Sequence, residues 1–171
     1  MDKPIFLIGF MGSGKTTWGK KLANRLNKKF VDLDHVLVEK VGMSIPTYFQ
    51  IYGEQKFREL ESQTLKEQIA PDTVISTGGG SPCYYDNMAW INENGLSLYL
   101  YLSPKALHGR LSQSNIESRP ALKGLQGEDL LAFIDEKLTE RAPFYTQAHI
   151  QIDQINASLD TICQQIENYV K

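Results

Sequence analysis

Short apolar segments alternate along the chain with longer segments in which apolar residues recur at the spacing of a helix. Five runs have the length and composition of strands: 4–8, 30–33, 73–77, 96–102 and, less strongly, 149–152. Helical periodicity covers the segments 15–26, 46–69, 85–94, 104–112, 128–145 and 159–170. Strands that alternate with helices predict a parallel sheet covered by helices on both faces.

Local signals mark the ends of several of these elements. Ser103 followed by Pro104 is typical of a helix N-cap with proline at the first helical position, and Ser158 can cap the last helix. Gly95 lies where a helix must stop before the next strand. With 171 residues, no internal repeat and no linker-like composition, the chain is expected to form one domain over residues 1–171.

One segment follows neither period. Residues 112–129 read SQSNIESRPALKGLQGED, which is polar and contains glycine. In a compact domain such a loop is either functional or a disordered connection. Because proline restricts the residue before it to an extended backbone, Arg119–Pro120 favours a mobile lid, over about 112–125, that presents the Arg119 side chain.

Composition and charge narrow the classes of partner. A hydrophobic content of 42% and a charged content of 22% are typical of globular proteins. The net charge of −2 and the scattered basic residues give no support for nucleic-acid binding. An apolar run of about 18 residues, as a membrane span needs, does not occur, and no signal peptide is recognisable, so a cytoplasmic location is expected. Cys83 and Cys163 are then expected to be reduced thiols.

The sequence GFMGSGKT, residues 9–16, lies between the first predicted strand and the first predicted helix. It satisfies the P-loop pattern, in which backbone N–H groups and a helix N-terminus surround phosphate. Lys15 would reach the outer phosphates and the Thr16 hydroxyl would bind Mg²⁺. The strand and helix in register favour this over a chance glycine turn. Regulators, motor ATPases and small-molecule kinases share the loop, so it does not define the reaction.

Two aspartates follow in the sequence FVDLD. If the strand continues, Asp32 and Asp34 point to one side at its carboxyl end, where parallel sheets bind ligands. One carboxylate could hold the metal and the other accept a proton from an attacking hydroxyl. The alternative is that they only cap the next helix.

Two arginines and a glycine run complete the candidate site. Arg58 has Glu54 and Glu61 at helical spacing, so an ordinary surface ion pair is an alternative to ligand binding. Arg141 has no carboxylate in the preceding turn and lies near Pro143, which is expected to end the helix, so it suits a ligand anion. In TGGG, residues 77–80, the glycines allow close approach of a ligand, unless they form only a structural turn.

Taken in order, GFMGSGKT, DLD, GEQKFRELE, TGGG, SRPAL and ERAPFY resemble the shikimate kinase family of nucleoside-monophosphate-kinase-like P-loop kinases over nearly the whole chain. The resemblance implies a three-layer α/β P-loop fold, with a five-stranded parallel sheet flanked by helices, a mobile lid and a shikimate-binding region at about 33–61. It implies Mg²⁺-dependent transfer of the ATP γ-phosphate to the 3-hydroxyl of shikimate, a step towards chorismate and the aromatic amino acids. A monomer is expected.

The resemblance also implies roles for individual residues. The nucleotide would be bound by Gly12, Ser13, Gly14, Lys15, Thr16, Thr17, Arg110 and Arg119, with Arg110 near adenine and Arg119 swinging over the phosphates. Thr16 and, through water, Asp32 would serve Mg²⁺. Shikimate would be bound by Asp34, Arg58, Gly78, Gly79, Gly80 and Arg141, with both arginines on its carboxylate. Lys15, Asp34 and Arg119 would be catalytic, Asp34 as base or orienting group.

Two other functions are compatible with part of this pattern. A related kinase of another polyol acid, such as gluconate, would need the P-loop and an arginine or two, but it fits GGG, DLD and SRPAL less well. A catalytically idle nucleotide-binding protein would not need Lys15, Asp32, Asp34 and Arg119 together.

Overall fold

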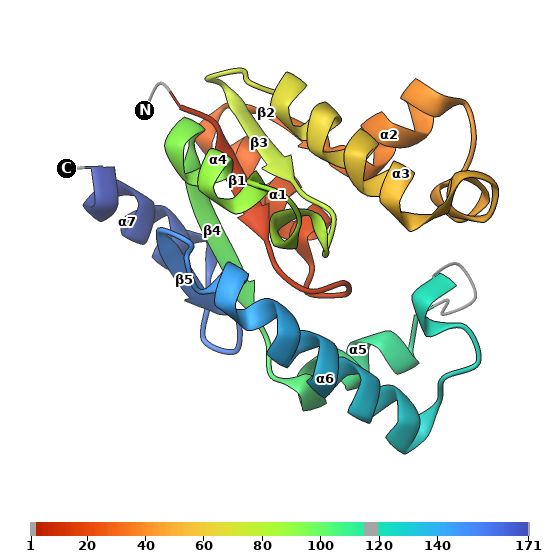
Figure 1. Cartoon of the computed structure of the whole chain (residues 1–171). Helices are drawn as coiled ribbons and strands as arrows, with labels where there is room; N and C mark the ends of the chain where they lie inside the picture. The colour runs from red at the N-terminus through yellow and green to blue at the C-terminus, as the bar shows by residue number, and fades with distance from the viewer. Residues whose placement is uncertain (1–2, 115–119, 171) are drawn as a thin grey trace.

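The computed structural model describes residues 3–114 and 120–170 (Figure 1). Its centre is a five-stranded sheet in the order β2-β3-β1-β4-β5, and every neighbouring pair is parallel. The strands are β1 (Ile5–Ile8), β2 (Lys29–Asp32), β3 (Thr73–Ser76), β4 (Leu96–Tyr101) and β5 (Ile150–Asp153). The predicted parallel α/β sheet is confirmed, and each strand lies within one or two residues of its predicted bounds.

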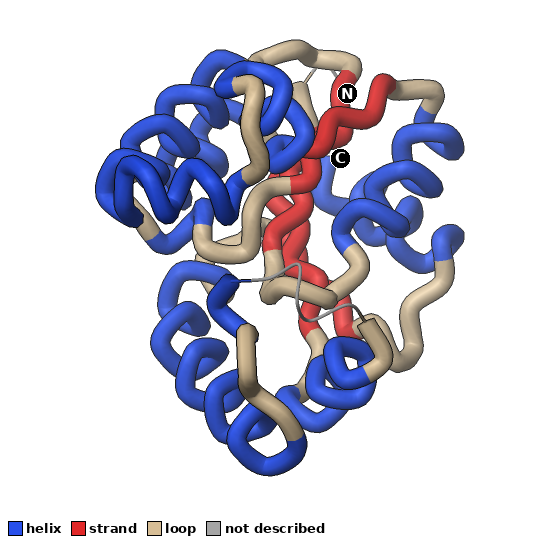
Figure 2. The backbone as a smooth tube through the Cα atoms, turned by 90° about the vertical axis from the view of Figure 1, so that its right-hand side faces the viewer, coloured by secondary structure: helices blue, strands red, loops and turns tan. Residues whose placement is uncertain are grey.

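Helices cover both faces of the sheet, which Figure 2 shows as a central band of strands between helices. They are α1 (Lys15–Leu26), α2 (Leu33–Val41), α3 (Ile45–Glu67), α4 (Asn87–Asn94), α5 (Pro104–Ser112), α6 (Gly127–Tyr145) and α7 (Leu159–Val170). Two short 3₁₀ helices, η1 (Ser81–Cys83) and η3 (Pro120–Leu122), lie in the connections. None of the helices in the described ranges is long and apolar enough to cross a membrane.

Alternate residues of the central strand face two separate cores. Ile5 and Leu7 of β1 pack with α1 and α7, whereas Phe6 and Ile8 pack with α3, α4 and α6. All four are fully buried, as expected of a strand in a parallel sheet covered on both faces. The three layers follow directly from this alternation.

The predicted caps are present. The Ser103 hydroxyl accepts a hydrogen bond from the Ala106 N–H, and the Ser158 hydroxyl accepts one from the Thr161 N–H. The α4 helix ends at Gly95, whose N–H donates to the Ile91 carbonyl.

One local prediction is wrong. The sequence indicated no helix between 34 and 45, yet α2 occupies Leu33–Val41, directly after β2. The helix predicted over 128–145 is α6, and Pro143 lies in its last turn. A proline near a helix end loses few backbone hydrogen bonds, so the last turn can form around it.

Candidate active site

The P-loop joins β1 to α1 with a backbone that only glycine adopts readily. Gly12 and Gly14 have φ angles of 76° and 87°, in the left-handed region. The Lys15 ammonium folds back over the loop and donates to the carbonyls of Gly9 and Phe10 at 2.9 and 3.0 Å. Lys15 is therefore held beside the N-terminus of α1, where an anion is favoured.

A cleft of about 400 Å³ opens beside the loop at the carboxyl ends of the strands. It brings together most of the residues predicted for nucleotide and metal. The predicted residues that line it are Gly12, Gly14, Lys15, Thr16, Thr17, Asp32, Asp34, Gly79 and Arg110. The buried Ser13 lies within the loop itself, and Arg119 lies outside the described residues.

Arg110 reaches the P-loop from α5. Its Nη1 donates to the Ser13 carbonyl at 3.3 Å and lies 3.5 Å from Gln154 Oε1. The Trp18 indole N–H donates to the same oxygen at 3.0 Å. Gln154 and Trp18, which were not among the predicted site residues, thus attach Arg110 to α1 and to the loop after β5.

The two aspartates do not share a strand face, as the alternation in FVDLD suggested. Strand β2 ends at Asp32, whose carboxylate caps α2 by accepting from the Asp34 N–H at 3.1 Å, while Asp34 lies in the first turn of α2. The capping alternative is therefore correct for Asp32, but both side chains still line the cleft. Asp32 also accepts a hydrogen bond of 2.7 Å from the Thr16 hydroxyl.

The environment of Asp34 shifts its pKa upward. The residue lines the cleft and is exposed. Partial desolvation and the neighbouring Asp32 raise the pKa of Asp34, against the opposing charges of Lys15 and Arg58. A carboxylate with a raised pKa is better matched to proton transfer near neutral pH.

Arg58 is not in a surface ion pair. Its side chain is only 12% exposed, and its Nη1 donates to Glu61, 1% exposed, at 2.9 Å. The contact to the largely exposed Glu54 is longer, at 3.4 Å. Arg58 lines a second cavity of about 690 Å³, and Arg141 lines it from α6.

Arg141 keeps an unused hydrogen-bonding group. Its guanidinium lies over the Phe10 ring, 5.3 Å from the centroid. Its Nη1 is buried and has no hydrogen-bond partner, and no carboxylate of the described ranges forms an ion pair with it. Because a buried unpaired donor is costly, this arrangement favours an anionic ligand in the cavity.

The triple glycine separates the cleft from the cavity and leaves no room for side chains. A Cβ added to Gly78 would lie 2.4 Å from Glu61 Oε1, and one at Gly80 would lie 2.8 Å from Arg58 Nη1. At Gly79 it would lie 3.1 Å from the Met11 N of the P-loop and 3.6 Å from Arg141 Nη1. This loop therefore brings the phosphate-binding and arginine-lined regions into contact.

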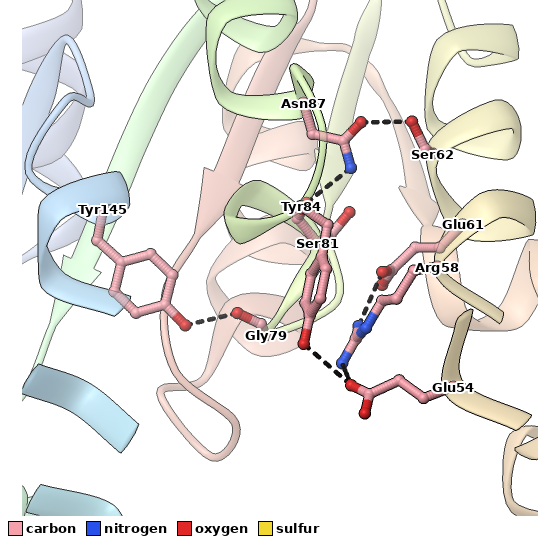
Figure 3. A network of polar contacts seen from close by, with 9 residues as sticks. All are labelled: Glu54, Arg58, Glu61, Ser62, Gly79, Ser81, Tyr84, Asn87 and Tyr145. Atoms are coloured by element: carbon pink, nitrogen blue, oxygen red, sulfur yellow. Dashed lines mark hydrogen bonds and ion pairs between the residues drawn. The ribbon is translucent and has the colours of Figure 1, made fainter. Parts of the chain in front are cut away.

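Polar contacts hold the glycine loop from two sides (Figure 3). The Tyr145 hydroxyl of α6 donates to the Gly79 carbonyl. The Asn87 amide donates to the Ser81 carbonyl at 2.8 Å and accepts from Ser62 of α3 at 2.6 Å. Sequence reasoning missed these supporting residues, because nothing in their spacing indicates that they meet.

Glu61 is a buried carboxyl group with a strongly raised pKa. Desolvation raises its pKa to about 7, against the favourable charge and hydrogen bond of Arg58. Sequence reasoning treated Glu61 only as a surface partner of Arg58. Its position three residues after Arg58 was the available signal, but burial could not be inferred from it.

Glu61 should make stability depend on pH. Since the pKa of Glu61 in the folded protein exceeds its ordinary value of 4.5, ionising the side chain costs free energy in the fold, and stability falls as pH rises from about 4.5 through 7. Glu61→Gln removes this ionisation cost. The unfolding free energy of the variant, relative to that of the wild type at the same pH, should therefore rise by about 1–3 kcal/mol from pH 5 to pH 8. Urea unfolding at both pH values measures it. Glu93→Gln, an exposed position on α4, is the control, and equal changes in both variants would contradict the burial argument.

Comparisons with known proteins agree with this geometry. The shikimate kinase family model matches residues 11–171. A curated shikimate kinase of Parabacteroides distasonis is 45% identical over 152 residues, which cover 88% of this chain and 87% of that protein.

Solved structures extend the likeness to the fold. A crystal structure of shikimate kinase from Bacteroides thetaiotaomicron superposes with a TM-score of 0.85 at 38% identity over 98% of both chains. Shikimate kinase from Acinetobacter baumannii in complex with shikimate gives a TM-score of 0.84 at 32% identity, over 98% of this chain and 92% of that one. The chain belongs to the shikimate kinase family.

Proposed function

We propose that this protein is an ATP-dependent shikimate kinase, which transfers the γ-phosphoryl group of ATP to the 3-hydroxyl of shikimate and releases shikimate 3-phosphate and ADP. One observation carries the proposal: the triple-glycine loop lies against the P-loop on one side and against Arg58 and Arg141 on the other. A phosphate donor and a small carboxylic acid would thus meet at Asp34. We expect a monomer, as the family resemblance implies, and a cytoplasmic location.

The P-loop would bind the nucleotide. Backbone N–H groups of the P-loop and the ammonium of Lys15 would bind the phosphates, and Lys15 would stabilise the charge that develops on the transferred group. Arg110 would lie against the adenine. Arg119, which lies outside the described residues, would close over the phosphates as part of a lid.

Magnesium fits the oxygen donors at the edge of the cleft. The Thr16 hydroxyl and the Asp32 carboxylate lie 2.7 Å apart, and hard oxygen ligands of this kind suit Mg²⁺. No group of three His, Cys, Asp or Glu side chains that could hold a metal ion occurs in the described ranges. Mg²⁺ in kinase sites is usually held by one or two carboxylates together with substrate phosphates and water. When bound, the ion would neutralise charge on the phosphates.

The acceptor would be bound by cationic groups at its carboxylate and by a carboxylate at its reacting hydroxyl. Arg58 and Arg141, which line the second cavity, would bind the carboxylate of shikimate. Gly78, Gly79 and Gly80 would contact its ring, as the family resemblance implies. Asp34 would accept a hydrogen bond from the reacting hydroxyl and remove its proton as the phosphoryl group transfers. Holding the two substrates in line for phosphoryl transfer would also contribute to catalysis.

The direct test is ADP release in a coupled assay with Mg·ATP and shikimate. We expect turnover that depends on shikimate and is absent with gluconate or without acceptor. If the protein bound ATP but released no ADP with shikimate, the P-loop assignment would stand and the acceptor would be wrong. Stabilisation by nucleotide alone, with no effect of any polyol acid on melting temperature, would instead indicate an idle nucleotide-binding protein.

Metal removal should abolish the reaction. Excess EDTA is expected to stop shikimate-dependent ADP release, and added Mg²⁺ should restore it. Asp32→Asn should raise the Mg²⁺ concentration needed for half-maximal rate by roughly tenfold, because it removes one charged ligand from the ion's surroundings. A metal titration of both proteins measures this, and unchanged turnover in EDTA would exclude the metal.

Gly80→Ala should weaken shikimate binding. Gly80 has φ −88° and ψ −14°, which alanine also adopts, so the effect would come from the new Cβ pressing on Arg58. We expect a shikimate KM raised about tenfold with the ATP KM nearly unchanged, because the guanidinium is displaced from its position. Gly109→Ala is the control, since a Cβ there has nothing within 4 Å. An equal rise in both variants would contradict the steric argument.

A further inference from the structure

Tyr84 lies against the arginine on which the proposed acceptor site depends. The short helix η1 follows the glycine loop, and Tyr84 is the next residue after η1. The centroid of its ring is 4.2 Å from the Arg58 guanidinium carbon. Its hydroxyl donates to Glu54 Oε1 at 2.9 Å. Figure 3 shows Arg58 between Glu61 on one side and Glu54 with Tyr84 on the other.

The hydrogen bonds of Arg58 alone do not fix its plane. Nη1 has a short bond to Glu61, Nε is buried without a partner, and Nη2 has only the 3.4 Å contact to Glu54. One short bond does not by itself set the guanidinium plane. Three aromatic rings lie near the group, and the Tyr84 centroid, at 4.2 Å from the guanidinium carbon, is nearer than those of Phe57 and Phe49, at 5.3 and 6.0 Å, so Tyr84 makes the closest cation–π contact of the three.

Tyr84 also binds the Glu54 carboxylate, which competes with a ligand anion for Arg58. Glu54 is 58% exposed and could neutralise Arg58 in place of a ligand anion. Its Oε1 lies nearer to the Tyr84 hydroxyl, at 2.9 Å, than to Arg58 Nη2, at 3.4 Å. The Tyr84 hydroxyl therefore competes with Arg58 Nη2 for this oxygen, and the contact to Arg58 is the longer of the two.

We infer that Tyr84 is a positioning residue for the acceptor carboxylate and acts through Arg58: its ring sets the guanidinium plane, and its hydroxyl keeps Glu54 at the rim. This inference rests on the proposed binding of shikimate by Arg58. It assigns Tyr84 no contact with ATP and no part in proton transfer.

The test compares Tyr84→Leu, which removes the aromatic face, with Tyr84→Phe, which retains it. We expect Tyr84→Leu to raise the shikimate KM about tenfold, with kcat and the ATP KM within about twofold of wild type. Tyr84→Phe should raise it by less than about threefold. Tyr85→Leu, at the neighbouring exposed tyrosine, is the control and should leave all three constants unchanged.

A double-mutant cycle separates positioning from general packing. In an Arg58→Ala background, Tyr84→Leu should change the shikimate KM by less than about twofold, because its effect passes through the missing guanidinium. An equal effect in both backgrounds, equal effects of leucine and phenylalanine, or a fall in kcat with unchanged shikimate KM would overturn the inference. If Arg58→Ala itself left the shikimate KM unchanged, the proposed role of Arg58 would fall instead, and absence of turnover in the wild type would refute the proposed function.

Discussion

Exchanging Asp34 for asparagine is expected to lower kcat for shikimate phosphorylation by about 10²–10⁴-fold, the usual contribution of a positioned general base. Asparagine keeps the shape of the side chain but cannot accept the proton of the acceptor hydroxyl. The shikimate KM should change much less, because the arginines would still bind the carboxylate. Steady-state kinetics with each substrate varied in turn measures the two effects separately.

The variant should remain folded. Among the described residues, none donates a hydrogen bond to the Asp34 side chain, and desolvation, with repulsion from Asp32, raises the pKa of Asp34. Losing this charge should therefore leave the melting temperature unchanged or slightly higher. Asp32 is different, since it caps α2 and accepts from Thr16.

Asp135→Asn, an exposed position on α6, controls for the loss of one carboxylate and should retain full activity. A near-normal kcat for Asp34→Asn would exclude Asp34 as an essential base. A large rise in shikimate KM with unaltered kcat would make it a binding group alone.

Much of the fold could be predicted because its signals are local. Strand and helix periods, the Ser103 and Ser158 caps and Gly95 act within a few residues, and the structure retains each of them. Helix α2 was missed because its local signal was ambiguous. Its start depends on the Asp32 carboxylate turning back to the Asp34 N–H, and the strand-like FVDLD concealed that turn.

The residues that meet at the candidate site could be predicted as types but not as partners. Glu54 and Glu61 both lie at helical spacing from Arg58, and only the packing of α3 decides that one is exposed and the other buried. The contacts of Tyr84 with Arg58 and of Tyr145 with Gly79 join distant segments. Sequence spacing carries no information about such pairs in a single chain.

Replacing Arg58 with alanine is expected to raise the shikimate KM by about 10–100-fold while the ATP KM stays within about twofold. The reason is the loss of charge-assisted hydrogen bonds to the acceptor carboxylate, each worth roughly 1.5–3 kcal/mol. Lys15 and the P-loop are separate from Arg58, so nucleotide binding should be retained. Arg58→Lys should lie between, since it keeps the charge but loses the planar donor pair.

Arg58→Ala also leaves Glu61 buried without its ion-pair partner, which could cost about 3–5 kcal/mol of stability. The double variant Arg58→Ala/Glu61→Gln removes both charges and should recover most of that loss without recovering the shikimate KM. Urea unfolding and steady-state kinetics on the wild type, both single variants and the double variant separate stability from binding. Equal losses for shikimate and ATP, or a shikimate KM restored together with stability, would show that Arg58 supports the fold and does not bind the acceptor.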